Sequence, residues 1–393
     1  MNLFVLLRHR IVGLFLLTFL LNGCSLFSGL IEGEDNREPP AELEPIQGEL
    51  PVRQLWSAQV GGSDAAQFLD LRPAYLEGRI YAAGSDGWVT ALDATTGESV
   101  WRTRLDDARI VGGVGVGEGL VVVSGAEGEV IALDFEGRER WRVNLGSQAL
   151  APAALAEGRV VARTSDGRVR GLSAADGAEL WMLERRLPAL TLRGASQPLI
   201  QAGNVIVGMA NGRLVVVDLG QGRPIWERTV ATPSGRSELE RMVDIDADPL
   251  GYQDKLYVAA FQGRLMEINF NDGSVNWARP LSTYTGLAAG PRWLAVTDEV
   301  GELWVLERLS GEPILKQNAL RGRSPTAPRQ VGEWLVAGDF EGYAHWFSLE
   351  TGQEAARIRV DRTGIRAAPL VVGDVVYVLS QGGVLSALTL DSP

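Results

Sequence analysis

A pattern of about forty residues occurs eight times in this chain of 393 residues, and it constrains the fold more than any other feature. In its clearest copy, residues 84–101 read GSDGWVTALDATTGESVW: a glycine turn, an apolar run, a second glycine turn and a tryptophan. The glycines of the first turn lie 41, 39, 45, 51, 38, 41 and 41 residues apart, at Gly87, Gly128, Gly167, Gly212, Gly263, Gly301, Gly342 and Gly383. A period near forty made of short strands and turns is typical of propeller blades rather than of helical repeats.

Each unit reads as four short antiparallel strands, with a hairpin turn such as Asp86-Gly87 between the second and the third. The fourth strand carries a tryptophan, to which we assign a packing role, in six places: Trp56, Trp101, Trp141, Trp181, Trp226 and Trp277. Trp56 stands ahead of the first complete unit, whereas the eighth unit has only three strands, within residues 369–390. We therefore predict an all-β fold, an eight-bladed β-propeller of four-stranded blades, whose ring closes when the N-terminal strand joins the C-terminal blade.

The first 23 residues predict a secretory signal peptide. Arg8 and Arg10 precede an apolar run, residues 11–21, that is shorter than the roughly 20 residues needed to cross a membrane core. Residues 21–24, Leu-Asn-Gly-Cys, resemble the bacterial lipobox, in which the cysteine is lipidated and becomes the mature N-terminus. The resemblance implies a lipid anchor on Cys24, and sorting to the outer membrane because Ser25 rather than aspartate follows it. The alternative is an ordinary signal peptide that ends near a cysteine.

The segment after the cysteine is acidic and contains a pair of prolines at residues 39–40. It has little apolar surface to bury, so we predict that residues 24–50 form a flexible acidic tether. Residues 51–393 then make up the propeller.

The residue composition argues against catalysis. Without residues 1–23, His345 is the only histidine, and once Cys24 is lipidated no free thiol remains. These counts exclude histidine metal clusters, Ser-His triads and thiolate sites, and the alternating apolar stretch around His345 predicts a structural role. The net charge of −12 becomes −14 when Arg8 and Arg10 leave, which argues against nucleic acid as a partner. We predict no catalytic residue, no cofactor and no metal site.

The repeat resembles the Ala-x-Asp-x-x-x-Gly-x-x-x-Trp motif of quinoprotein (PQQ-type) propellers, as residues 91–101 show. The resemblance covers essentially the whole body and implies that the tryptophans and the glycine turns lock neighbouring blades together. An active quinoprotein dehydrogenase is also expected to have a vicinal cysteine pair, which a chain with a single cysteine cannot supply. A small quinoprotein dehydrogenase therefore stays as an alternative function, beside another periplasmic ligand-binding propeller.

Lipobox, length and repeats together resemble the BamB family, lipoproteins of the machinery that folds β-barrel proteins into the outer membrane. Two insertions, residues 187–194 and 232–250, support this resemblance, because matching segments of the family help to dock the periplasmic (POTRA) domains of the barrel insertase. The resemblance implicates these residues in partner binding: Leu190, Leu192, Arg193, Asp244 and Asp246. Two alternatives stay open, namely that the leucines fill a gap between blades and that the aspartates, with Asp248, begin a Ca²⁺ loop.

We therefore predict a non-catalytic scaffold subunit of the β-barrel assembly machinery. It would be lipid-anchored to the outer membrane on its periplasmic face and would dock the insertase beside the other lipoproteins of the complex. We expect a monomer within that complex. Direct binding of unfolded outer-membrane proteins is left open.

Overall fold

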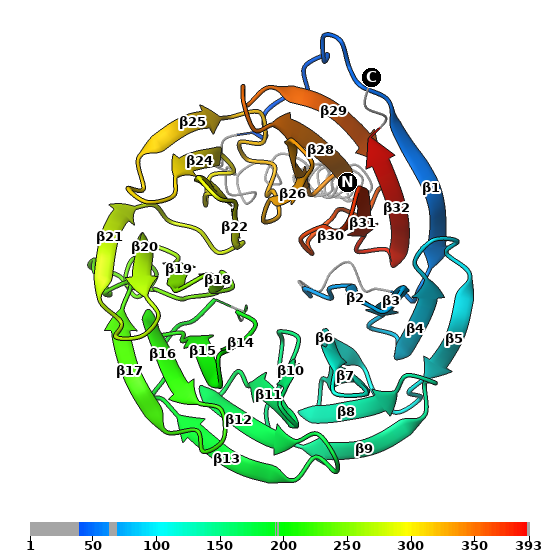
Figure 1. Cartoon of the computed structure of the whole chain (residues 1–393), viewed down its shortest axis with the longest axis vertical. Helices are drawn as coiled ribbons and strands as arrows, with labels where there is room; N and C mark the ends of the chain where they lie inside the picture. Colours follow the sequence, from blue (N-terminus) through cyan, green and yellow to red (C-terminus); the bar gives the residue numbers. More distant parts are fainter. Residues whose placement is uncertain (1–38, 63–68, 193, 195, 391–393) are drawn as a thin grey trace, which may run out of the picture. The chain divides into compact units, whose positions relative to one another are not determined.

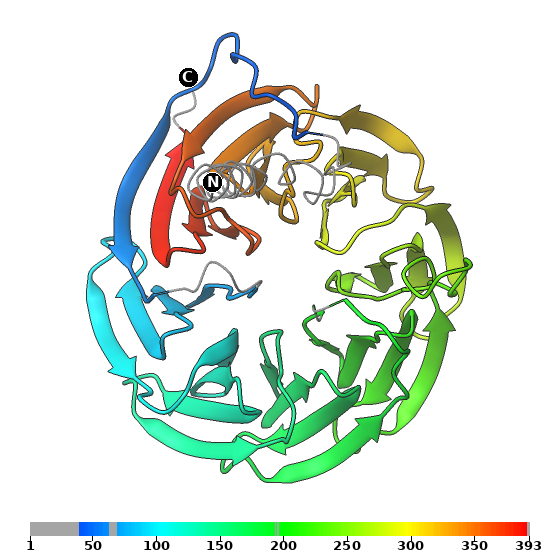
Figure 2. The same ribbon diagram turned by 180° about the vertical axis from the view of Figure 1, so that it is seen from behind.

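The computed structural model describes residues 39–62, 69–192, 194 and 196–390. All strands of this part lie in eight four-stranded antiparallel sheets, which stand as blades around one axis (Figures 1 and 2). The predicted eight-bladed β-propeller is therefore confirmed. No helix of the described residues is long and apolar enough to cross a membrane.

The strands follow the chain order around the ring, four to a blade. Blades one to four consist of β2 Ala74–Leu76, β3 Arg79–Ala83, β4 Trp88–Asp93 and β5 Ser99–Arg104; β6 Ile110–Gly117, β7 Leu120–Gly125, β8 Glu129–Asp134 and β9 Glu139–Asn144; β10 Ala154–Ala156, β11 Arg159–Arg163, β12 Arg168–Ser173 and β13 Glu179–Glu184; β14 Leu199–Gln201, β15 Asn204–Gly208, β16 Arg213–Asp218 and β17 Pro224–Thr229. Blades five to eight consist of β18 Leu250–Tyr252, β19 Lys255–Ala259, β20 Arg264–Asn269 and β21 Val275–Pro280; β22 Leu287–Ala289, β23 Trp293–Thr297, β24 Leu303–Glu307 and β25 Pro313–Gln317; β26 Arg329–Val331, β27 Trp334–Gly338, β28 Tyr343–Ser348 and β29 Glu354–Arg359; β30 Leu370–Val372, β31 Val375–Leu379, β32 Val384–Leu390 and β1 Val52–Gln59.

The two ends of the described chain close the ring. The N-terminal strand β1 pairs with β32 in antiparallel register, with Val52 opposite Leu390 and Gln59 opposite Val384. The last blade therefore takes its fourth strand from the start of the body, as the incomplete eighth unit predicts. Closure removes the unpaired edge that an open ring would expose.

The antiparallel order places the loops on two faces. Turns between the first and second strands, and between the third and fourth, lie on one face of the ring. Turns between the second and third strands lie on the other, together with the segments that lead to the next blade. We call this second face the connection face.

The six tryptophans link each blade to the next. The Nε1 group of Trp56 donates a hydrogen bond to the carbonyl of Ala94 in the neighbouring blade, 3.1 Å away. The five others bond in the same way to the carbonyls of Phe135, Ala174, Leu219, Phe270 and Arg308. A Cβ on Gly97, whose φ is +73°, would lie 2.5 Å from the Trp56 ring, so only glycine lets the indole pack on this turn.

Two blades carry another residue at the tryptophan position. In blade six Leu315 takes its place and packs on the turn at Gly352. Blade seven carries the buried Ala356, which faces blade eight. The third and fourth strands of that blade come from opposite ends of the chain, so no turn exists there for an indole to cover.

Residues 40–50 differ from the predicted flexible tether. The amide of Ala41 donates to the carbonyl of Arg321 at 2.8 Å, and the amide of Leu50 donates to the carbonyl of Ala355 at 2.9 Å. These residues therefore lie against blade seven, because arginine side chains and backbone carbonyls of the ring supply hydrogen bonds that the composition of the segment does not indicate. Cys24 and residues 25–38 lie outside the described residues.

Candidate functional site

The two insertions lie in two connections that meet on the connection face. The first connection, residues 185–198, joins β13 to β14, and the second, residues 230–249, joins β17 to β18. Both are connections between consecutive blades, so the fold brings together segments about fifty residues apart in sequence. The predicted docking residues all lie in these two connections.

Three aspartates of the second connection clamp the first one. The Asp244 carboxylate is stabilised by the backbone amide of Leu192. The Asp246 carboxylate lies so close to Gly194 that a Cβ there would be 2.8 Å from it. The Asp248 carboxylate accepts a hydrogen bond from the amide of Gln197 at 2.7 Å. The alternating aspartates thus lie along the described residues of the facing backbone, and we call them the aspartate clamp.

This arrangement differs from the Ca²⁺ loop that the spacing also allows. The three carboxylates lie beside three different residues of the facing backbone, Leu192, Gly194 and Gln197. Within the described ranges, no group of three histidine, cysteine, aspartate or glutamate residues is placed to hold a metal ion.

Arg163 is the cation beneath the clamp. It is the last residue of β11, and its guanidinium donates to the Ser196 hydroxyl at 3.2 Å, to the Ile245 carbonyl at 3.4 Å and to the Asp244 carboxylate at 3.5 Å. Its side chain and that of Asp244 are almost fully buried. One cation therefore reaches from blade three into both insertions and fixes them to the ring.

Among the described residues, Arg163 is the cation that acts on both Asp244 and Asp246, whereas Asp248 pairs with Arg72. Oδ2 of Asp244 and Oδ1 of Asp246 are buried and have no hydrogen-bond partner in the described part of the chain. Burial raises the pKa of the Asp246 carboxyl well above its ordinary range, and the neighbouring Asp244 raises it further. Burial also raises the pKa of Asp244, although Arg163 opposes this change. The pair therefore binds protons more tightly than free carboxylates do.

The predicted docking residues differ in how deeply they are buried. Leu190 is 42% exposed, and Leu192 is half-buried in a pocket of about 130 Å³ whose lining includes Arg163 and Asp244. Asp244 is fully buried and Asp246 is 7% exposed, so both support the surface from beneath instead of forming it. Arg193 lies outside the described residues.

Sequence reasoning did not single out two residues of this region. Arg163 follows three buried apolar residues at the end of the strand Arg159–Arg163, and a charged residue at that position was the available signal. Leu239 is 67% exposed in the second insertion, where the Glu240 carboxylate accepts hydrogen bonds from the amides of Arg236 and Ser237. An aliphatic side chain is thus displayed on a locally ordered loop, and no repeat marks it.

Known proteins are similar to this chain in both sequence and fold. A family model described as outer membrane protein assembly factor BamB matches residues 85–317, more than half of the chain. The outer membrane protein assembly factor BamB of Alkalilimnicola ehrlichii is 43% identical over 356 residues, which cover 90% of this chain and 92% of that protein.

Solved structures agree with this. The crystal structure of BamB from Moraxella catarrhalis has a TM-score of 0.79 at 27% identity, covering 86% of this chain and 100% of that one. The quinohemoprotein alcohol dehydrogenase of Comamonas testosteroni has a TM-score of 0.67 at 12% identity, covering 87% of this chain and 77% of that one. At this identity the enzyme shares the fold alone.

Proposed function

This chain belongs to the BamB family of outer membrane protein assembly factors, and we propose that it is a non-catalytic scaffold subunit of that machinery. Its docking surface would be the pair of insertions on the connection face, with Leu190, Leu192 and Arg193 toward the partner. The partner would be a periplasmic (POTRA) domain of the barrel insertase, beside the other lipoproteins of the complex.

The aspartate clamp is the observation that carries this proposal. A loop with an exposed aliphatic side chain is usually mobile, and ordering it on binding costs free energy. Here Asp244, Asp246 and Asp248 lie beside Leu192, Gly194 and Gln197, and the amide of Gln197 donates a hydrogen bond to Asp248. We infer that these contacts reduce the mobility of Leu192, which favours a protein partner.

We further propose the membrane attachment. Residues 1–23 would be removed as a signal peptide, and Cys24 would carry the lipid that anchors the protein to the periplasmic face of the outer membrane. Residues 51–393 form the propeller body, and residues 24–50 join it to the anchor. Mass spectrometry of the mature N-terminus, which detects a lipidated Cys24, tests this assignment.

Affinity purification from outer membranes solubilised in mild detergent tests the docking site. The barrel insertase is expected to co-purify with a C-terminally tagged parent protein and to be lost with the Leu192→Ala/Arg193→Ala double variant. The matched control is Leu309→Ala, because Leu309 is a 64% exposed leucine in a turn on the opposite face. Loss of the insertase from the control as well, or retention by the folded double variant, contradicts the assigned surface.

A further inference from the structure

The N-terminal segment before the first strand is bound to the ring along its whole described length. Its polar side chains are mostly exposed, whereas four apolar side chains are half-buried: Ala41, Leu43, Ile46 and Leu50. At one end Ala41 bonds to Arg321, in the connection between blades six and seven. At the other end Leu50 bonds to Ala355 in β29, the outer strand of blade seven. The segment therefore runs along the outside of this strand, and its upstream end lies at the connection face.

Two arginines of the ring hold this segment by its backbone. Nη1 of Arg323 donates to the carbonyl of Ala41 at 3.0 Å, and Nη2 of Arg357 donates to the carbonyl of Glu44 at 2.7 Å. Charged donors make stronger hydrogen bonds than neutral ones do. Because the acceptors are carbonyls, these two hydrogen bonds do not depend on the identity of the segment's side chains, which add apolar contacts of their own.

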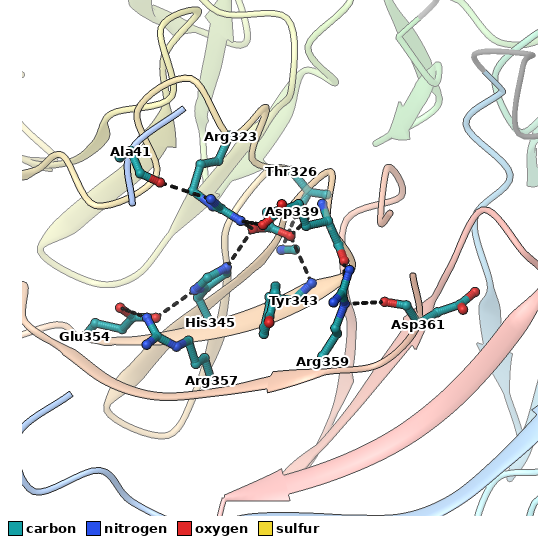
Figure 3. A network of polar contacts seen from close by, with 12 residues as sticks. Ala41, Arg323, Thr326, Asp339, Tyr343, His345, Glu354, Arg357, Arg359 and Asp361 are labelled. Carbon is teal, nitrogen blue, oxygen red and sulfur yellow. Dashed lines mark hydrogen bonds and ion pairs between the residues drawn. The ribbon is translucent and has the colours of Figure 1, made fainter. Parts of the chain in front are cut away.

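A buried chain of charges joins the two arginines (Figure 3). Arg323 forms an ion pair with Asp339 at 2.7 Å. A hydrogen bond of 3.2 Å joins Asp339 to Nε2 of His345. Nδ1 of His345 contacts Glu354 at 2.7 Å, and Glu354 pairs with Arg357 at 3.5 Å. His345 is fully buried at the centre of this chain. Both arginines that hold the segment are thus positioned through one imidazole.

The network is balanced when the imidazole is charged. The cations are then Arg323, His345 and Arg357, and the anions are Asp339, Glu354 and Glu341, which also pairs with Arg323. Burial opposes the charge on His345, but the hydrogen bonds to Asp339 and Glu354 outweigh it and raise the pKa of the imidazole. The Tyr343 and Phe347 rings pack about 6 Å from the imidazole ring and bring no further charge.

We propose that residues 41–50 form a strap that docks on blade seven through Arg323 and Arg357, and that this strap fixes where the N-terminal tether leaves the propeller. The exit point lies at the connection between blades six and seven. It is therefore on the same face as the two insertions. That these insertions form the docking surface rests on the proposed function, whereas the strap itself does not.

Hydrogen exchange of the full mature chain tests the strap. In Arg357→Gln the amides of residues 41–50 should exchange about tenfold faster than in the parent protein, because one charged hydrogen bond is lost. The matched control is Arg142→Gln in blade two. Arg142 occupies the equivalent position of an outer strand and pairs with a glutamate three residues before it, but it does not touch the strap. Equal exchange in the two variants overturns the proposal.

A second variant leaves the buried network intact. Leu43→Ser/Ile46→Ser removes the apolar contacts of the strap alone, and it should speed exchange in residues 41–50 while the blades stay protected. Unchanged exchange in this variant, or a parent protein in which residues 41–50 already exchange at the rate of an unfolded peptide, overturns the strap.

Photo-crosslinking in native outer membranes tests the exit point. A benzoylphenylalanine at position 42 should crosslink to a peptide from residues 318–328 of the same chain. The absence of this internal crosslink contradicts the exit point, even if the insertase still co-purifies. Conversely, the crosslink is expected to persist in the Leu192→Ala/Arg193→Ala variant, which separates the strap from the proposed function.

Discussion

Two buried clusters of charged residues in this ring differ in charge balance. In blade seven, Arg323, His345 and Arg357 face three carboxylates, and each carboxylate has a cationic partner. In the insertion cluster, Arg163 is the only cation among the described residues within ion-pair distance of Asp244, and one oxygen each of Asp244 and Asp246 has no hydrogen-bond partner among them.

The pKa directions follow from this difference. The Asp339 carboxyl is buried, which alone would raise its pKa, but His345 and Arg323 outweigh burial and lower it. Burial instead raises the pKa of Asp244 and Asp246. The balanced cluster therefore fixes the positions of its side chains. In the insertion cluster, two carboxylate oxygens beneath the proposed docking surface could each accept one more hydrogen bond.

Removal of Arg163 should have the largest effect on stability. In Arg163→Met the acidic pair loses its cation, so the free energy of unfolding should fall by about 3–5 kcal/mol, the typical cost of breaking a buried ion pair. The loss should be smaller at pH 5 than at pH 8, because protonation neutralises the pair. Urea unfolding at both pH values measures it.

Asp246→Asn in the Arg163→Met background is the control. It should restore part of the lost stability, since it removes one of the two buried charges. A loss below about 1 kcal/mol in the single variant contradicts a net stabilising role for the cation and supports the view that buried pairs contribute little.

Replacement of His345 should have an intermediate effect. His345→Gln removes one cation from the balanced network and should destabilise the protein by about 1–3 kcal/mol at pH 6, the range for lost hydrogen bonds to charged groups. Since the folded state raises the pKa of the imidazole, its contribution is complete below the unfolded pKa and is lost as the pH rises through the folded pKa. The difference between parent and variant should therefore shrink toward alkaline pH, as thermal unfolding at several pH values can show. An equal difference at every pH contradicts a charged imidazole.

Asp246→Asn alone should stabilise the protein at alkaline pH, in contrast to the replacements of Arg163 and His345. The folded state raises the pKa of Asp246, so its favourable contribution is present at acid pH and is lost as the pH rises through the folded pKa. The asparagine variant should be more stable than the parent at pH 8, on the order of 1 kcal/mol for each pKa unit of the removed shift. Melting temperatures between pH 5 and pH 8 should vary less for the variant. A variant that is less stable at pH 8 would show that the carboxylate is charged and favourable there.

The part of this structure that repeats could be predicted from the sequence. The tryptophans and the turn glycines recur at a fixed spacing, so each copy supports the others, and the missing fourth strand of the eighth unit predicts closure by β1. Arg163 and Leu239 do not recur, and their roles depend on contacts with distant segments. Asp244 and Asp246 were marked as part of a docking surface, but only the structure places them beneath it.

The order of the strap, on the other side of the ring, also could not be predicted from the sequence. It is acidic and follows the proline pair at residues 39–40, which predicts a flexible segment. Its order comes from arginine donors on blade seven that bond to its carbonyls, and no property of the segment itself indicates them.

Leu190→Ser should have the smallest effect on stability and a large effect on binding. Leu190 is 42% exposed, so the free energy of unfolding should change by no more than about 0.5 kcal/mol. If the aspartate clamp serves to present this side chain, insertase recovery in co-purification should fall severalfold although the melting temperature stays the same. Leu309→Ser, an exposed leucine on the opposite face, should change neither quantity. A variant at position 190 that binds like the parent would mean that the unbalanced cluster serves the fold of the two connections and that the partner contacts another part of the ring.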